Sequence, residues 1–385
     1  MKLSIVLPTR NGGELLEGCL RSILDQDYSD MELVVSDNAS DDRTPDILES
    51  FAGDPRLKVL RLDEPVEVTD NWINGVNATS GDYLLLIGDD DCLLPGYCER
   101  IDELIEKYDR PDCITYNGYA YAFPGALAGH PHSHYSDPFY EWGSGLPAEG
   151  PLPADLRREI ARDFFRFHYR IHLNLQTTIV SRRAIGRMRK GFLRPPYPDF
   201  YALNALMLVA DSWVYSPDKL IVIGISPKSY GHTVHGDDRA EGEQYLGISL
   251  DFPGQLPGHA VINGTYVCLL ELKEDYGPEL AGIEIDRGQY LFNQIYAWYL
   301  QWRVGSLPRR TFLRRLRALP ARDWLLFLRG LAPHLSPKRV LRNVRISRSE
   351  PVQHLWPGLR PLPEVSDIEG FRDWVTRARV PAAGP

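Results

Sequence analysis

The sequence predicts an α/β protein whose main domain is built on a doubly wound, largely parallel sheet. Within the first 90 residues, apolar runs of strand length alternate with stretches of helical periodicity, which is the pattern of repeated strand–helix–strand units. Polar loops at residues 9–13, 36–42 and 88–91 each follow one of these runs. Because the carboxyl ends of parallel strands lie at one edge of a sheet, we expect the three loops to line one crevice.

The individual elements are predicted from the spacing of apolar residues. Strands are expected at residues 3–7, 31–35, 56–62, 83–87, 112–121, 177–180 and 220–225. Helices are expected at residues 14–25, 44–51, 155–171 and 201–209, with 71–80 as helix or loop. The first strand ends at Pro8, and Pro45 suits the first turn of its helix. The run from Tyr83 to Ile87 is apolar or aromatic throughout, which predicts a strand buried on both faces.

Length and composition describe a globular protein of two parts. At 385 residues the chain exceeds the usual size of one domain. Its formal net charge of −9 argues against general nucleic-acid binding. Five scattered cysteines without a CxxC pair fit a reducing compartment, and no segment approaches the ~20 apolar residues of a membrane span. We therefore expect a cytoplasmic protein, with attachment to the inner face of the membrane left open.

The central strand leads directly into three carboxylates, Asp89, Asp90 and Asp91. Adjacent carboxylates repel one another when they lose hydration, so they need a cation or strong hydrogen-bond donors. Oxygen ligands suit Mg²⁺ or Mn²⁺, and such an ion suits a diphosphate. No GxGxxG motif follows the first strand and no GxxxxGK[ST] motif is present, so neither a dinucleotide site nor a P-loop is expected. The alternative is that the three aspartates form a solvated turn.

The order of these segments resembles that of family 2 glycosyltransferases. The resemblance rests on Ile-Val-Leu-Pro-Thr-Arg-Asn at residues 5–11, Glu-Leu-Val-Val-Ser-Asp-Asn-Ala-Ser-Asp-Asp at 32–42, and Gly81-Asp82-Tyr83 running into residues 89–91. It covers residues 1 to about 100. It implies a GT-A fold, in which helices flank a Rossmann-like, mostly parallel twisted sheet. It also implies a nucleotide-sugar donor, a divalent metal (Mn²⁺ or Mg²⁺) and inversion at the anomeric carbon.

The resemblance also implies roles for single residues. The implied nucleotide-binding residues are Pro8, Thr9, Asn11, Asp37, Asn71, Asp89 and Asp90. Among them, Asp37 would hydrogen-bond the nucleobase and Asp89 would contact the ribose, while Asp90 and Asp91 would face the metal as part of the "DxD" signature. Gly88 stands where the commonest pattern has an aspartate, so which two of the three aspartates bind the metal stays open. Each residue also has a structural alternative as a turn or helix-capping residue.

The sequence departs from the family pattern at the positions that would contact the diphosphate. Trp72 and Ile73 occupy the place of a common Arg-Asn pair, which leaves Asn71 and Asn74 as the local polar candidates.

An inverting transfer also needs a base that takes the proton of the acceptor hydroxyl. In the family this base is an acidic residue that begins a helix, and Asp199 has that position, with Asp211 as second candidate and a plain helix cap as the alternative. In the loop at residues 226–235, His232 is the candidate third metal ligand, ahead of His235, and Lys228 is a nearby basic residue. An exposed loop histidine is the alternative.

The last third of the chain is basic. Residues 303–348 contain twelve arginines and one lysine against one acid, Asp323. Interleaved apolar residues predict amphipathic helices, which could bind an anionic membrane, pack on the acidic domain or form a homodimer. We expect a catalytic domain at 1–235 (a nucleotide-sugar half at 1–100 and an acceptor half at 101–235), a helical basic region at 236–350 and a proline-rich, extended tail at 351–385.

Together these features predict a metal-dependent inverting glycosyltransferase of polysaccharide or glycoconjugate biosynthesis. It would move a sugar from a nucleoside-diphosphate sugar, with a UDP-sugar as the expected donor, to a glycan or lipid-linked acceptor. A sugar nucleotidyltransferase is one alternative, although the loop at residues 9–13 has a single arginine. A non-catalytic nucleotide-sugar-binding module is the other.

Overall fold

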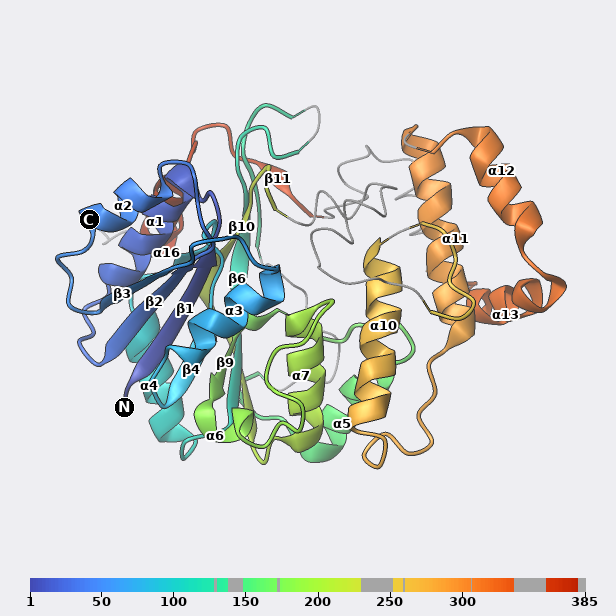
Figure 1. The fold of residues 1–385 in the computed structure, drawn as a ribbon, viewed down its shortest axis with the longest axis horizontal. Coiled ribbons are helices and arrows are strands. Elements are labelled where there is room, and N and C mark those ends of the chain that lie inside the picture. The colour runs from blue at the N-terminus through green and yellow to red at the C-terminus, as the bar shows by residue number, and fades with distance from the viewer. Residues whose placement is uncertain are drawn as a thin grey trace, which may run out of the picture.

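The computed structural model describes residues 1–127, 130–137, 148–171, 174–229, 252–258, 260–305, 307–335 and 358–379. A large twisted sheet with helices on both faces forms one side of the molecule, and the helices between residues 260 and 331 form the other (Figure 1). The prediction of an α/β fold with a C-terminal helical extension is therefore confirmed.

The strands join into one sheet. They are β1 (Leu3–Thr9), β2 (Met31–Asp37), β3 (Leu57–Arg61), β4 (Tyr83–Leu86), β5 (Cys92–Leu93), β6 (Cys113–Ala122), β7 (His134–Ser136), β8 (Gly150–Pro151), β9 (Thr178–Ser181), β10 (Trp213–Ile225) and β11 (Arg360–Pro361). The main path runs β11-β7-β6-β9-β4-β1-β2-β3, and β10 pairs with β5, β6 and β8.

The helices follow the expected alternation in the first half. They are α1 (Gly13–Leu24), α2 (Thr44–Ser50), α3 (Val68–Asn77), α4 (Tyr97–Lys107), α5 (Ala154–Phe164), α6 (Arg182–Ile185), α7 (Pro198–Val209), α10 (Ala260–Asp275), α11 (Arg287–Val304), α12 (Arg309–Ala318), α13 (Ala321–Leu331) and α16 (Ile368–Arg379). None of the helices in the described ranges is long and apolar enough to cross a membrane.

The sheet topology places a ligand crevice between β1 and β4. Strands β3, β2, β1 and β4 are parallel, and the chain moves outward from β1 in both directions. Such a reversal of strand order opens a crevice at the carboxyl ends of the two strands. The register aligns Thr9 with Asp37 at that edge, so the ends of β1 and β2 enter the crevice together.

Alternating side chains of the strands build two cores, one on each face of the sheet. On β1, Ile5 and Leu7 pack with α1, α2 and α4, whereas Val6 packs with α3, α5 and α7. The core that contains Val6 continues through Leu269 of α10 and Leu291 of α11. The C-terminal helices are therefore anchored to the sheet domain by apolar packing.

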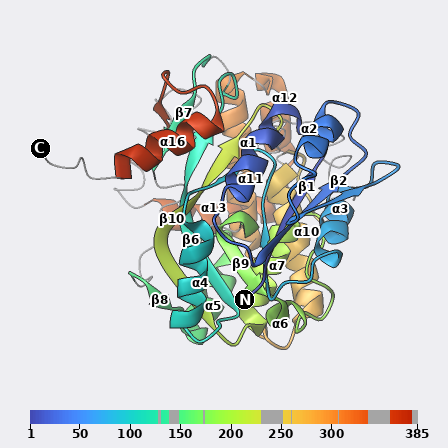
Figure 2. The ribbon, with the colours of Figure 1, turned by 90° about the vertical axis from the view of Figure 1, so that its left-hand side faces the viewer.

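The expected extended tail is wrong for the residues that the structure describes. Residues 360–361 pair with β7, and α16 lies beside α1 and β10 (Figure 2). Ile368, Phe371 and Val375 recur at helical spacing and are buried, and Phe371 stacks on Tyr121 with ring centroids 4.9 Å apart. The apolar stripe outweighs the prolines that precede it. A second difference is that β10 begins at Trp213, earlier than expected.

Candidate active site

The three polar loops come together at the carboxyl ends of β1, β2 and β4. The Thr9 hydroxyl at the end of β1 donates a hydrogen bond of 2.6 Å to Asp89 Oδ2, beyond the end of β4. The backbone N–H of Asn38, which follows β2, donates to the Thr9 carbonyl oxygen at 2.9 Å. These contacts confirm the prediction that the three polar loops meet at one edge.

Asn11 connects the first two loops. Its backbone N–H donates to Ser40 Oγ at 2.9 Å, and its side-chain carbonyl accepts from the backbone N–H of Asp41 at 3.0 Å. Its φ of 55° is left-handed, a conformation that asparagine tolerates better than most residues. Lys228, in the loop after β10, donates to the Asn11 carbonyl oxygen. A fourth loop therefore closes on the crevice.

Asp91 differs from its two neighbours because it is only 1% exposed and both of its oxygens have backbone donors. Oδ2 accepts from the N–H of Gly88 at 2.8 Å, and Oδ1 accepts from the N–H of Gly224 in β10 at 2.9 Å. A Cβ at Gly224 would overlap the carbonyl oxygen of Asp90, so this close approach requires glycine. Asp91 thus ties the loop at residues 88–91, called the acidic loop, to β10.

Asp89 and Asp90 are half-buried and lie nearer to the opening. Asp90 Oδ2 accepts a hydrogen bond of 2.8 Å from Ser229 Oγ. Burial, helped by the charge of Asp90, raises the pKa of Asp89 to about 7, and burial also raises the pKa of Asp90. Burial, again with the charge of Asp90, raises the pKa of Asp91 well above its usual value. The loop therefore concentrates carboxylates that are unfavourable without a positive partner.

The described ranges contain no set of three His, Cys, Asp or Glu side chains arranged to hold a metal ion. The predicted third ligand, His232, lies outside the described residues, as does His235. Asp89 and Asp90 are the members of the acidic loop whose oxygens are less committed to the backbone.

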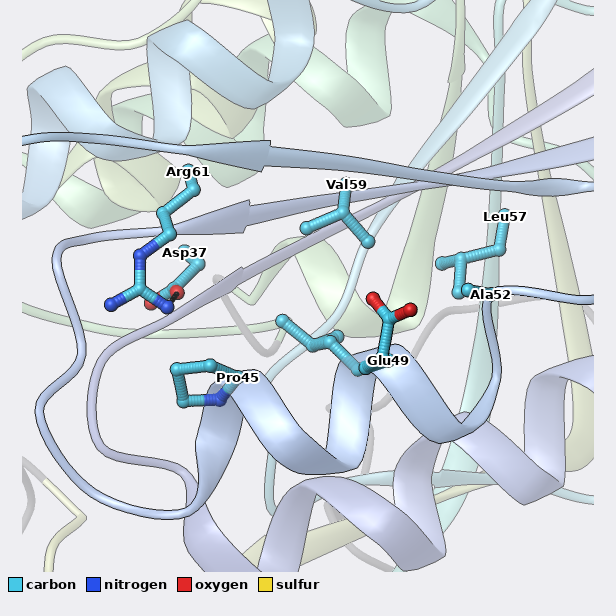
Figure 3. A pocket seen from close by; sticks show the side chains of 8 residues that line it. Asp37, Pro45, Glu49, Ala52, Leu57, Val59 and Arg61 are labelled. Carbon is cyan, nitrogen blue, oxygen red and sulfur yellow. Dashed lines mark ion pairs between the residues drawn. The ribbon is translucent and has the colours of Figure 1, made fainter.

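Asp37 is only 1% exposed at the end of β2. Its Oδ1 accepts from the backbone N–H of Ser40 at 3.0 Å, while Oδ2 has no hydrogen-bond donor in the described structure. Arg61 Nη1 lies 3.5 Å from Oδ2. Both side chains line a pocket of about 360 Å³ between β3 and α2 (Figure 3). A buried acceptor that lacks a donor is costly, which makes Asp37 ready to receive one from a ligand.

Other nucleotide-binding candidates have structural partners. Pro8 is half-buried on β1. Asn71 of α3 is buried, accepts from the Ser36 hydroxyl at 2.7 Å and donates to the Ser36 carbonyl at 3.2 Å. Asn74 donates to the same hydroxyl at 2.9 Å. These asparagines fix α3 to β2, and a contact of Asn71 with a diphosphate stays a prediction.

Asp199 is half-buried in the first turn of α7. Its Oδ1 accepts from the backbone N–H of Phe200 at 3.0 Å, and burial raises its pKa to about 7. Helix α7 is about 18 Å long, and it ends just before β10, which runs parallel to β6. The helix therefore starts toward the carboxyl edge of the sheet (Figure 1).

Asp211, the second candidate for the base, lies at the opposite edge. It directly precedes β10 and forms an ion pair of 2.8 Å with Arg187. The side chains that sequence reasoning did not identify are Arg61 beside Asp37 and Ser229 beside Asp90. Neither belongs to a recognisable motif: Arg61 is the last residue of β3, inside a predicted strand, and Ser229 lies in the loop after the predicted strand at 220–225.

Comparison with known proteins finds similarity to glycosyltransferases. The family described as Glycosyl transferase family 2 matches residues 4–173. A GalNAc(5)-diNAcBac-PP-undecaprenol beta-1,3-glucosyltransferase of Campylobacter jejuni is 34% identical over 128 residues, or 33% of this chain and 38% of the relative. A PGL/p-HBAD biosynthesis glycosyltransferase of Mycobacterium bovis is 40% identical over 115 residues, or 29% and 44%. The chain thus spans about two fifths of the length of these curated relatives.

Solved structures resemble the chain more distantly. Staphylococcus aureus TarS 1–349 in complex with UDP-GlcNAc has 15% identity and a TM-score of 0.48 over 81% of this chain and 83% of that chain. A mannosyltransferase from Pyrobaculum calidifontis in complex with GDP-Man and Mn²⁺ has 14% identity and a TM-score of 0.49 over 92% and 87%.

Proposed function

Because the chain carries a family 2 glycosyltransferase domain across residues 4–173, we propose that it is an inverting, metal-dependent glycosyltransferase. It would move a sugar from a nucleoside-diphosphate sugar to a hydroxyl of a glycan or lipid-linked acceptor. The division of the chain at residue 235 into catalytic and helical parts belongs to the same proposal.

The observation that carries the proposal is the meeting of Thr9, Asp37 and Asp89 at one edge of the sheet. Polar side chains from three separate segments converge there, as a nucleotide site at the strand-order reversal requires. Beside them, two residues of the loop after β10 contact the same edge: Ser229 donates to Asp90, and Lys228 donates to the Asn11 carbonyl oxygen.

The acidic loop fits a divalent ion. Mg²⁺ and Mn²⁺ in phosphate-transfer sites usually take one or two carboxylates, with phosphate oxygens completing the coordination. Asp89 and Asp90 can supply these carboxylates, and Asp91, with both oxygens on backbone amides, would hold the loop in place. An ion bound there would neutralise the charge of the departing diphosphate.

Asp37 is proposed to select the nucleobase. Its Oδ2, which has no hydrogen-bond donor in the described structure, can accept one from a ring N–H. Uracil and guanine offer such a group, and we propose a UDP-sugar as donor. Arg61, which lies beside Oδ2, would move aside or stay as a second contact when the base enters.

Asp199 is proposed as the base. The acceptor oxygen forms a bond to the anomeric carbon as the bond from that carbon to the diphosphate oxygen breaks. The hydroxyl proton passes to Asp199, and the configuration inverts. A carboxylate with a pKa of about 7 is well matched to this transfer near neutral pH.

The proposed acceptor is supported by the name of the Campylobacter relative, which includes an undecaprenol-linked glycan. We place the reaction in the cytoplasm, since all five cysteines are free and buried, as expected for a reducing compartment.

The proposal is tested by thermal unfolding of the full chain with UDP, GDP, CDP and ADP, each with and without Mn²⁺. We expect metal-dependent stabilisation by one of them, about 2.7 kcal/mol at a hundredfold excess over Kd. The matching nucleotide sugar, incubated with lipid-linked glycan extracts, should release nucleoside diphosphate only with metal. Asp27→Asn, an exposed acid in the turn between α1 and β2, is the control and should behave as the wild type.

Other outcomes favour the rivals. Release of pyrophosphate from a nucleoside triphosphate and a sugar phosphate would identify a nucleotidyltransferase. Metal-dependent binding without turnover on any acceptor would identify a binding module. Stabilisation by nucleotides that is independent of metal and unchanged in Asp90→Asn would contradict the proposed metal site.

A further inference from the structure

We propose that the outer faces of α12 and α13 form a docking surface for an anionic lipid membrane. This surface, called the basic end, carries six exposed arginines: Arg309, Arg310, Arg314, Arg317, Arg322 and Arg329. It lies at the end of the molecule furthest from the sheet (Figure 1), so a membrane there would leave the crevice free.

The inner faces of both helices are already used in packing. On α12, Phe312 stacks on Trp302 of α11, with ring centroids 5.4 Å apart and planes 2° apart. On α13, Gly330 meets Gly288 of α11 so closely that a Cβ at either position would overlap the backbone of the other helix. The helices are thus fixed with one side against α11, and among the described residues their outer sides have no covering partner.

Among the residues of α12 and α13, almost no negative charge offsets the arginines of the basic end. Asp323 is the single acid of α12 and α13, and it turns inward to Arg287, with an Oδ2–Nη2 distance of 3.3 Å. In the described structure none of the six arginines has an ion pair with an acid. The whole chain carries a net charge of −9, so the charge of the basic end is opposite in sign to that of the protein as a whole.

Apolar side chains project from the same surface. Leu325 and Leu328, one turn apart on α13, are 71% and 56% exposed. Arg322 and Arg329 share this side of the helix because they lie three and four residues from Leu325. Large leucines held in water beside cations are unfavourable unless a partner covers them.

An anionic membrane is the partner that matches both properties. Leucines can enter the acyl boundary while arginines pair with lipid phosphates, as in interfacial amphipathic helices. A nucleic acid would match the arginines but leave the leucines in water. A second copy of this chain could offer acidic groups, but it would have to cover leucines that project from the end of the molecule.

The inference concerns a surface separate from the nucleotide crevice and does not depend on the transfer reaction. If both hold, the enzyme would work at the surface where lipid-linked acceptors reside.

The test is co-sedimentation of the full chain with phosphatidylcholine vesicles, with or without one third phosphatidylglycerol, in the absence of nucleotide. We expect binding to the anionic vesicles only, and weaker binding as salt is raised. Arg322→Ser/Arg329→Ser should weaken binding by about fivefold for each arginine removed. Leu325→Ser/Leu328→Ser should weaken it by about tenfold or more.

The matched control is Leu270→Ser on α10, where an exposed leucine (39%) lies outside the basic end. It should bind as the wild type. The midpoint of thermal unfolding without nucleotide should be nearly the same in all variants, which shows that each is folded and keeps this test independent of the transfer reaction. Absence of wild-type binding, or equal binding to neutral vesicles, would overturn the proposal. So would a lipid-free dimer that the leucine variant converts to monomer, since the surface would then join two copies.

Discussion

The acidic loop and the basic end both gather charge of one sign, but they differ in burial. In the acidic loop, carboxylates lie within the fold, accept backbone and hydroxyl hydrogen bonds, and have raised pKa values. At the basic end, arginines point into solvent around a packed helical pair. Burial makes each carboxylate depend on its neighbours, whereas exposed charges act almost independently. Substitutions should therefore have large, specific effects in the first region and small ones in the second.

The largest effect is expected for a carboxylate outside the acidic loop, the half-buried Asp199. Asp199→Asn should lower kcat by about 10²–10⁴-fold, which is the usual contribution of general base catalysis. Metal-dependent stabilisation by nucleoside diphosphate should be unchanged. Turnover within tenfold of the wild type would remove Asp199 from the role of base.

The pH profile sharpens the same assignment. A base acts only when deprotonated, and burial raises the pKa of Asp199 to about 7. In the wild type, kcat should therefore rise with pH up to about 7 and then level off, instead of levelling off near pH 4. The residual activity of Asp199→Asn should lack this rise, as steady-state rates from pH 5 to 9 would show.

The proposed roles of Asp90 in ion binding and of Asp91 in bracing the acidic loop can be separated by replacing each aspartate with asparagine. Asp90→Asn should lower kcat/KM by about 10²–10³-fold without lowering the free energy of unfolding, since it removes a like charge. Asp91→Asn turns an NH₂ group toward one of two backbone donors and should cost about 1–3 kcal/mol in urea unfolding. If both variants lose stability equally, the division between ion-binding and bracing carboxylates is wrong.

A backbone contact should also reveal how tightly the loop is held. Gly224→Ala places a Cβ onto the Asp90 carbonyl oxygen and should destabilise the protein by about 1–3 kcal/mol. Gly53→Ala, where the added Cβ meets nothing within 4 Å, serves as the control in the same urea titration. Equal urea midpoints for the two variants would show that the acidic loop shifts to accommodate the added methyl group at little cost in stability.

The smallest effect is expected at the basic end. Arg322→Ala removes an exposed side chain and should change the free energy of unfolding by less than about 0.5 kcal/mol. A larger loss in thermal unfolding would mean that Arg322 supports the fold, which would weaken the contrast between the two regions.

Much of the sheet domain is predictable because its signals are local. Apolar runs locate β1, β2 and β4, and polar residues directly after them locate Thr9, Asp37 and Asp89. Parallel pairing then brings the three together without further information. The bond from Thr9 to Asp89 is the contact that this reasoning implies.

The partners of Asp91 and Asp90 are not predictable in this way. Asp91 accepts from the backbone N–H of Gly224, 133 residues away, and a backbone donor so distant in the sequence leaves no motif that pairs it with Asp91. Ser229 reaches Asp90 from a loop whose conformation has no sequence signature. The helical spacing of Ile368 and Phe371 in α16 could have been read, but the surrounding prolines favoured an extended tail.

The packing of α16 also bears on how the chain can be cut or fused. Phe371 and Val375 share a core with Tyr121 and with Cys92 and Val222, next to the residues that brace the acidic loop. Proteolysis or truncation before residue 358 would remove the helix that covers Tyr119 and Tyr121 of β6, and the exposed aromatic surface would favour aggregation. A shortened catalytic fragment would therefore be a poor stand-in for the enzyme, and affinity tags belong beyond α16.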